Sequence, residues 1–248
     1  MPFGLVYAPS TFERLMEHEM RGLHWKDCLV YMDDLIVPAE SFEKEIERLE
    51  LVLQRLEQAN LKLKPSKCVF FQKKVKFLGH VVSEDGVETD PDKVSAVSEW
   101  PRPKSKKQLR SFLGLCSYYR RFVMNFAAIA RPLHKLCKKS AKYEWSDQAE
   151  QAFNALKSSM TKTPVLVLPS LGKSFILDTD SSEYAVGGVL SQEYPEGERV
   201  IAYMSKSLNI HERAYCVTRK ELFAVVAEEV SHILKRTEGS SSDRKFSS

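Results

Sequence analysis

Residues 28–38 read CLVYMDDLIVP, and this stretch decides the kind of fold that the chain can adopt. Two short apolar runs flank the adjacent Asp33 and Asp34, and Pro38 ends the second run. Apolar runs of strand length that are joined through a few polar residues predict a β-hairpin, here with both carboxylates at its tip. Such a pair is costly unless a cation or a hydrogen-bond donor meets it, and carboxylate oxygens suit magnesium. An ordinary acidic turn is the alternative, and a bare Asp-Asp pair alone favours that alternative.

Helical and strand patterns alternate after the hairpin. Residues 41–60 predict an amphipathic helix, because apolar side chains recur there at spacings of three and four: Phe42, Ile46, Leu49, Leu53 and Leu56. Residues 61–71 and 75–87 predict β segments, with a turn at Glu84-Asp85-Gly86. Asp90 and Pro91 then suit the cap and the first position of another helix.

The second half of the chain repeats this alternation. Residues 104–123 predict a helix, shorter helical pieces follow to Leu136, and Ser146 caps a helix that extends to Met160. Residues 175–182, 185–192 and 199–205 predict strands, and residues 217–234 a helix. The chain is therefore expected to have a mixed α+β fold, and its small, polar C-terminal tail is expected to be disordered.

Composition is that of a globular protein: 248 residues, 43% hydrophobic and 28% charged. This length predicts one to two domains. Disorder and collagen are excluded for the bulk of the chain, and no apolar run approaches the roughly 20 residues that cross a bilayer. The five cysteines and six histidines have no spacing typical of a disulfide framework or a zinc site. No secretory signal is visible, so an intracellular location is expected.

Positive charge is concentrated in two segments, although the net charge is only +4. Residues 101–142 contain twelve lysines and arginines and no acid, and residues 61–76 contain six lysines and no acid. Tyr118, Tyr119, Phe122 and Phe126 lie among the cations of the first segment. Such segments on an otherwise acidic chain indicate a polyanion partner, most simply a nucleic-acid backbone. A solvated basic helix face is the alternative.

The hairpin sequence YMDD is one of a series of motifs that occur in a fixed order. MPFGL and APSTF precede it, and LKLKPSKCVF, FLGHVVSEDGV, TDPDK, WPRP, LRSFLGLCSYYRRFV and LDTDSS follow it. Over residues 1 to about 230 this series resembles the reverse transcriptase and ribonuclease H region of gypsy-type LTR retrotransposon Pol polyproteins. The resemblance implies a partial right-hand polymerase palm over residues 1–88 and a helical thumb over residues 89–140. It further implies a linker over 141–170, a truncated ribonuclease H-like domain over 171–236 and a disordered tail over 237–248.

The resemblance also implies roles for individual residues. Asp33 and Asp34 would be catalytic, metal-binding carboxylates of the polymerase, with Asp33 as the principal ligand, and Asp180 and Glu221 those of the ribonuclease H. Asp178 is an alternative on the same strand face, but TDSS at Asp180 matches the TDAS of the family. Pro2, Phe3 and Gly4 would lie near the incoming nucleotide. The expected primer- and template-binding residues are Phe77, Leu78, Gly79, His80, Lys106, Lys107, Arg110, Arg120 and Arg121.

By the same resemblance the expected activity is RNA-directed DNA polymerisation with associated ribonuclease H, through two-metal phosphoryl transfer. Mg²⁺ is the expected cofactor, with Mn²⁺ as a substitute. The expected partners are an RNA/DNA hybrid, a DNA primer-template, deoxynucleoside triphosphates and the remainder of the Pol polyprotein, with no membrane. The expected location is cytoplasmic, within the virus-like particle of the parent element.

Several departures from the family pattern qualify these expectations. The fingers and the first palm strand, with its metal-binding aspartate, are expected to be missing. After Leu234 the chain does not match the family's strand with the third ribonuclease H carboxylate, and Asp243 does not replace it. Tyr7, Glu13 and Ser182 stand where the family usually has Asn, Gln and Ala. The chain is therefore expected to be an incomplete fragment with little or no activity. The alternatives are a non-catalytic nucleic-acid-binding remnant and an unstable relic.

Overall fold

The computed structural model describes residues 4–24, 26–170 and 172–226. The chain divides between Phe77 and Leu78 into two compact units, which we call unit 1 and unit 2. None of the helices within the described ranges is long and apolar enough to cross a bilayer. The expected boundaries of palm, thumb, linker and ribonuclease H-like domain stay predictions, and the expected disordered tail lies outside the described residues.

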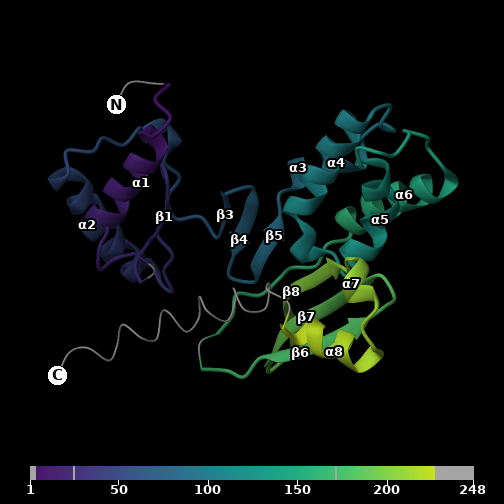
Figure 1. The fold of residues 1–248 in the computed structure, drawn as a ribbon. Helices are drawn as coiled ribbons and strands as arrows, with labels where there is room; N and C mark the ends of the chain where they lie inside the picture. The colour runs from purple at the N-terminus through teal and green to yellow at the C-terminus, as the bar shows by residue number, and fades with distance from the viewer. Residues whose placement is uncertain (1–3, 25, 171, 227–248) are drawn as a thin grey trace. The chain divides into compact units, whose positions relative to one another are not determined.

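Unit 1 combines two helices with short strands (Figure 1). Its elements are α1 (Ala8–Glu19), β1 (Leu29–Tyr31), β2 (Asp34–Ile36), α2 (Phe42–Gln58), the 3₁₀ turn η1 (Pro65–Lys67) and β3 (Lys74–Phe77). Strands β1 and β2 form the predicted antiparallel hairpin. The buried core of the unit is Met16, Met20, Cys28, Val30, Val52 and Leu56.

Helix α2 is confirmed, but it buries only part of the predicted apolar side. The Ser41 side chain accepts a hydrogen bond from the backbone N–H of Lys44 and so begins the helix. Val52 and Leu56 are buried, whereas Phe42, Ile46 and Leu53 are exposed. Arg48 Nε lies 3.3 Å from Asp27 Oδ1, so an ion pair shares the buried side of the helix with Val52. The apolar spacing alone could not predict that pair.

The predicted β segment over residues 61–71 is wrong, because the structure has only the turn η1 in that stretch. Pro65 has no N–H for a strand ladder, and its fixed φ suits the start of a 3₁₀ turn. Phe71 has a φ of 55°, which no regular strand contains. The stretch therefore runs as an irregular connection to β3.

Unit 2 begins with a hairpin of β4 (His80–Ser83) and β5 (Gly86–Thr89), with the predicted turn between them. The backbones of Val87 and Leu166 exchange two hydrogen bonds of 2.7 and 3.0 Å along the free side of β5. A Cβ on Gly86 would lie 2.1 Å from the carbonyl oxygen of Leu166, so only glycine fits there. The hairpin is thus fixed to the segment around Leu166, far along the chain.

Four helices make the largest core of the protein. They are α3 (Pro91–Ser98), α4 (Lys106–Tyr118), α5 (Phe126–Leu136) and α6 (Asp147–Thr161), with the turn η2 (Arg120–Phe122) after α4. The predicted cap residues Asp90 and Ser146 both accept hydrogen bonds from the first turns of their helices. Side chains without exposed surface, such as Leu109, Phe112 and Leu156, fill the space between the helices.

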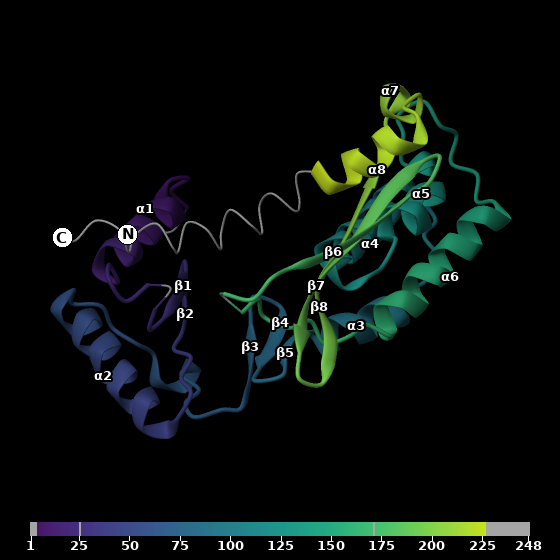
Figure 2. The ribbon, with the colours of Figure 1, turned by 90° about the horizontal axis from the view of Figure 1, so that it is seen from below.

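An antiparallel sheet of order β6-β7-β8 completes unit 2, from β6 (Ile176–Ser181), β7 (Ala185–Tyr194) and β8 (Gly197–Ser207). The short helix α7 (Ile210–Arg213) and α8 (Val217–Val226) follow, near one end of these strands (Figure 2). The predicted strands are confirmed, and the predicted helix over 217–234 is confirmed as far as Val226. The remainder of that helix lies outside the described residues.

Candidate functional site

The two aspartates of YMDD lie where the β1–β2 hairpin turns. Tyr31 pairs with Asp34 in the last rung of the hairpin, so Asp33 belongs to the turn and Asp34 begins β2. Both aspartates are exposed. Met32 has a φ of 52°, a left-handed conformation that tightens the turn. The carboxylates therefore lie side by side in the sequence on a short, accessible turn.

Glu13 of α1 holds this turn from outside the hairpin. Its carboxylate oxygen Oε2 accepts a hydrogen bond from the backbone N–H of Met32. Met32 directly precedes Asp33, so this hydrogen bond ties the turn to α1. The sequence indicated only that Glu13 differs from the family residue, and it gave no sign of this contact.

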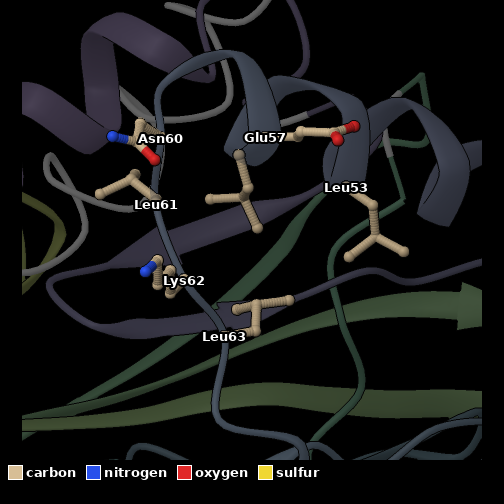
Figure 3. Close-up of a pocket in the computed structure, with 7 residues that line it drawn as sticks. Leu53, Glu57, Asn60, Leu61, Lys62 and Leu63 are labelled. Carbon is tan, nitrogen blue, oxygen red and sulfur yellow. The ribbon is translucent and has the colours of Figure 1, made fainter.

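A recess in unit 1 lies beside the end of α2 (Figure 3). It is lined mainly by leucines, with Glu57 and Lys62 among them, and it includes neither Asp33 nor Asp34. Its lining is mostly apolar, and Glu57 and Lys62 are its only charged residues. Of the expected nucleotide-binding residues, Pro2 and Phe3 lie outside the described residues. Gly4 is exposed, with a φ of 93° and open space around the position of a Cβ.

The residues expected to bind the primer form a tight turn. Leu78 and Gly79 have φ angles of 47° and 69°, and two successive positive φ angles are typical of a two-residue type I′ turn. The Tyr119 hydroxyl donates a 2.5 Å hydrogen bond to the carbonyl of Gly79, and the Tyr118 hydroxyl donates one to the carbonyl of Leu78. His80 follows the turn, and burial lowers the pKa of its imidazole, with the Arg121 charge as a smaller cause.

Four of the five cations expected to bind nucleic acid donate hydrogen bonds to backbone carbonyls of unit 2. Lys106 Nζ donates to the carbonyls of Lys138 and Ala141 at 2.7 and 2.5 Å, and Arg110 donates to the carbonyl of Cys137 at 3.0 Å. Through these bonds both cations stabilise the chain that follows α5.

Arg120 and Arg121 reach the sheet instead. Arg120 donates to the carbonyl of Ser205 and Arg121 to that of Ile201, so both tie the turn η2 to β8. Lys107, the remaining expected cation, is exposed on the first turn of α4.

The carboxylates expected in the ribonuclease H site lie on β6 and α8. Asp178 and Asp180 are both exposed and share one face of β6. Asp180 pairs with Gly187, which pairs with Ser205, and opposite residues of an antiparallel ladder point to the same face. Ser205 Oγ accepts a hydrogen bond from the N–H of Ala127, so this face is the one that meets α5.

Helix α8 packs on the other face of the sheet. Ala224 and Phe223 cluster with Val186, and Val186 alternates with Gly187 along β7. The structure therefore brings the helix that carries Glu221 against β6 and β7, but not onto the face of Asp178 and Asp180. Across the described ranges, no three His, Cys, Asp or Glu side chains form a group that could hold a metal ion.

Comparison with known proteins identifies the parts of the chain. The reverse transcriptase (RNA-dependent DNA polymerase) family model matches residues 1–82, and the model of the RNase H-like domain found in reverse transcriptase matches residues 145–239. Both families generally use divalent metal ions. The fold of the chain is similar to that of a foamy viral protease-reverse transcriptase solved with an RNA/DNA hybrid. The TM-score is 0.81 at 21% identity, over 94% of this chain and 32% of that chain. This likeness confirms the expected α+β fold.

The relatives in sequence are longer polyproteins. The retrovirus-related Pol polyprotein from transposon 297 of Drosophila melanogaster is 43% identical over 228 residues, which are 91% of this chain and 21% of the relative. That from transposon gypsy of the same species is 37% identical over 238 residues, 91% of this chain and 23% of the relative. The chain thus spans less than a quarter of the length of either polyprotein. It belongs to the gypsy-type retrotransposon Pol polyproteins and carries reverse transcriptase and ribonuclease H-like regions of them.

Proposed function

We propose that this chain supplies part of the polymerase site and part of the ribonuclease H site of a retrotransposon reverse transcriptase. The observation that carries the proposal is the exposed Asp33–Asp34 pair on a tight hairpin turn. This turn lies within the residues that match the reverse transcriptase family model. An isolated acidic turn would not need Glu13 to fix the backbone beside it.

The donor chemistry of the turn fits a magnesium ion. Mg²⁺ binds through one or two carboxylates and completes its shell with water and substrate phosphates. Asp33 and Asp34 offer such a pair, with Asp33 as the principal ligand, and Mn²⁺ is an acceptable substitute. When bound, the metal activates the attacking oxygen and neutralises phosphate charge. The hydrogen bond from the N–H of Met32 to Glu13 helps to hold the two carboxylates in position.

The substrates proposed here are deoxynucleoside triphosphates and a primer-template. Pro2, Phe3 and Gly4 would lie near the nucleotide, where glycine allows a close backbone approach. Phe77, Leu78, Gly79 and His80 would contact the primer strand. The foamy viral relatives were solved with double-stranded DNA and with an RNA/DNA hybrid, which supports the same class of ligand for this chain.

The basic segment of residues 101–142 would bind the nucleic-acid backbone. Lys107 is the best candidate of the five expected cations, because it is exposed, whereas the exposed Arg110 already donates to the carbonyl of Cys137. Lys106, Arg110, Arg120 and Arg121 donate hydrogen bonds to carbonyls, so they add to the positive field of the segment more than to specific phosphate contacts. The remainder of the Pol polyprotein is the proposed protein partner.

For the ribonuclease H-like region we propose Asp180 and Glu221 as the carboxylates of this chain. Asp180 lies one residue before the end of β6, within the residues that match the RNase H-like family model. The proposed domains are those stated above, from the palm over 1–88 to the ribonuclease H-like domain over 171–236. Among the described residues, neither pair of carboxylates belongs to a group of three that could hold a metal ion.

The test is binding of the purified chain to an RNA–DNA hybrid over a range of salt concentrations, together with primer extension in Mg²⁺. We expect binding that weakens steeply with salt, as phosphate contacts require. We expect no extension above that of an Asp33→Asn/Asp34→Asn variant. Absence of binding would contradict the nucleic-acid role, and extension above the double variant would contradict the incomplete site.

A further inference from the structure

Two neighbouring tyrosines hold the turn that precedes β4. Tyr118 and Tyr119 end α4, yet their hydroxyls donate hydrogen bonds to the consecutive carbonyls of Leu78 and Gly79, 40 residues away in the sequence. Both peptide groups of the turn are therefore fixed from the same helix. Burial, with smaller contributions from Tyr118 and Asp90, raises the pKa of Tyr119 to about 12, so its hydroxyl keeps the proton that it donates.

The rings of the same tyrosines enclose the next residue. His80 stacks on Tyr118, with ring centroids 5.3 Å apart and an interplanar angle of 13°, and it meets Tyr119 edge-on at 5.4 Å. Phe122 adds a third ring at 5.6 Å. Aromatic contacts of this kind add to the free energy of burial, and they fix the direction in which the chain leaves the turn.

The turn itself needs this support. Leu78 has a φ of 47°, a conformation that non-glycine residues rarely adopt without surrounding contacts. Gly79 has a φ of 69°, a conformation that favours glycine, while a Cβ there would make only ordinary contacts of 3.5 Å with both hydroxyls. The boundary between the two compact units falls directly before Leu78. The turn directly precedes β4, and both of its carbonyls are held by the tyrosines at the end of α4.

We propose that Tyr118 and Tyr119 are positioning residues for a nucleic-acid primer strand, which fix the Leu78–Gly79 turn to α4 so that the turn moves with the helices of unit 2. The primer part of this inference rests on the proposed function. The two hydrogen bonds from the tyrosine hydroxyls to the turn, which we call the clasp, do not depend on it. Helix α4 of the proposed thumb and the Leu78–Gly79 turn then move together, so a displacement of the helix also displaces the turn.

Amide hydrogen exchange of the purified chain tests the clasp without any nucleic acid. The variant is Tyr118→Phe/Tyr119→Phe, which keeps the rings and removes only the hydroxyls. The matched control is Tyr143→Phe, which removes a similar 2.7 Å bond to the carbonyl of Pro103 elsewhere in unit 2. We expect exchange at the amides of Gly79 and His80 to be about fivefold faster for each hydroxyl lost. The same exchange rates in the double variant and in the control would overturn the clasp.

Binding to two ligands tests the primer role. One is an RNA template with a recessed DNA primer, and the other is the same template strand alone. We expect the double variant to lose about fivefold in affinity for the primed template relative to the Tyr143→Phe control, and to bind the bare strand as the control does. Equal losses for both ligands would overturn the primer role. Failure of the wild-type chain to bind either ligand would overturn both that role and the proposed function. The amide exchange rates of Gly79 and His80 would still test the clasp, because they are measured without nucleic acid.

Discussion

The hydroxyl oxygen of Ser205, in β8, accepts a 3.0 Å hydrogen bond from the backbone N–H of Ala127, in the first turn of α5. First-turn amides have no partner inside their own helix. Within the described residues, the side chain of Asn125, which precedes α5 in a left-handed conformation, caps none of them. A strand about 80 residues later in the chain therefore supplies the missing cap. Arg120 joins the same residue through the carbonyl of Ser205, so the helices of unit 2 and the β6-β7-β8 sheet are tied at one point.

Ser205→Ala should destabilise unit 2 by about 1 kcal/mol, the usual effect of losing a helix cap. The matched control is Ser207→Ala, an exposed position near the end of the same strand, which should change stability little. The free energy of unfolding from urea titration measures both. Equal stability of the two variants would mean that the Ser205 hydroxyl does not stabilise α5.

Two glycine substitutions should have opposite effects. Gly86→Ala would place a Cβ 2.1 Å from the carbonyl oxygen of Leu166, and we expect a loss of about 3 kcal/mol from overpacking and strain. Gly114 lies inside α4 with nothing within 4 Å of a Cβ, so Gly114→Ala should raise stability by roughly 0.5–1 kcal/mol. Thermal unfolding measures both changes. A Gly86→Ala variant as stable as wild type would show that β5 does not need the close approach of Leu166.

The stability of unit 2 should decrease as the pH falls below the ordinary range of histidine. Burial, and secondly the charge of Arg121, lowers the pKa of His80 in the folded chain. Below about pH 6.5 the unfolded chain takes up a proton that the folded chain resists, so the stabilising contribution is present above that pH and is lost as the pH falls. The pKa of His134 is lowered as well, by burial and by Arg120, and it acts in the same direction.

His80→Phe removes one of these titrations and keeps an aromatic ring between Tyr118 and Phe122. We expect the difference in unfolding free energy between pH 7 and pH 5 to be smaller in this variant than in wild type. Denaturant unfolding at the two pH values gives the comparison. An unchanged difference would mean that the His80 environment does not disfavour the charged imidazole.

Substitution of two neighbouring lysines at the start of α4 should separate an effect on stability from an effect on nucleic-acid binding. Lys106→Met removes the hydrogen bonds to the carbonyls of Lys138 and Ala141, and should cost about 1–2 kcal/mol of stability. Lys107→Met should leave stability within about 0.5 kcal/mol, because that side chain is exposed. It should lower the slope of log affinity against log salt by about one for an RNA–DNA hybrid. A salt slope that does not change in the Lys107 variant would remove this residue from the interface.

The sequence predicts much of the fold because local signals agree with it. Helices begin at Asp90 and Ser146 as their capping chemistry requires, and the turn between β4 and β5 follows from Glu84 and Asp85. The error over residues 61–71 comes from reading apolar residues as a strand although Pro65 interrupts them. The buried side of α2 is predicted only in part, because Val52 lies outside the apolar series and Arg48 on that side pairs with Asp27 from another segment.

The candidate sites were less predictable, since they depend on contacts between distant segments. The hydrogen bond from Met32 to Glu13 joins residues that are 19 apart in the sequence, and no periodic pattern of side chains predicts it. The sequence predicts a strand for Asp180 and a helix for Glu221, and β6 and α8 confirm both. Their separation to different faces of the sheet follows from strand register and from the packing of Val186, which only the structure contains.

The central claim is that Asp33 and Asp34 form the carboxylate part of a divalent-metal site, and paramagnetic relaxation by Mn²⁺ tests it most directly. In wild type, Mn²⁺ should selectively broaden the backbone amide signals of residues 31–35 in nuclear magnetic resonance spectra, since the ion would lie within a few ångström of that turn. In Asp33→Asn/Asp34→Asn this broadening should disappear. Broadening that persists in the double variant, or that is absent in wild type, would contradict the claim.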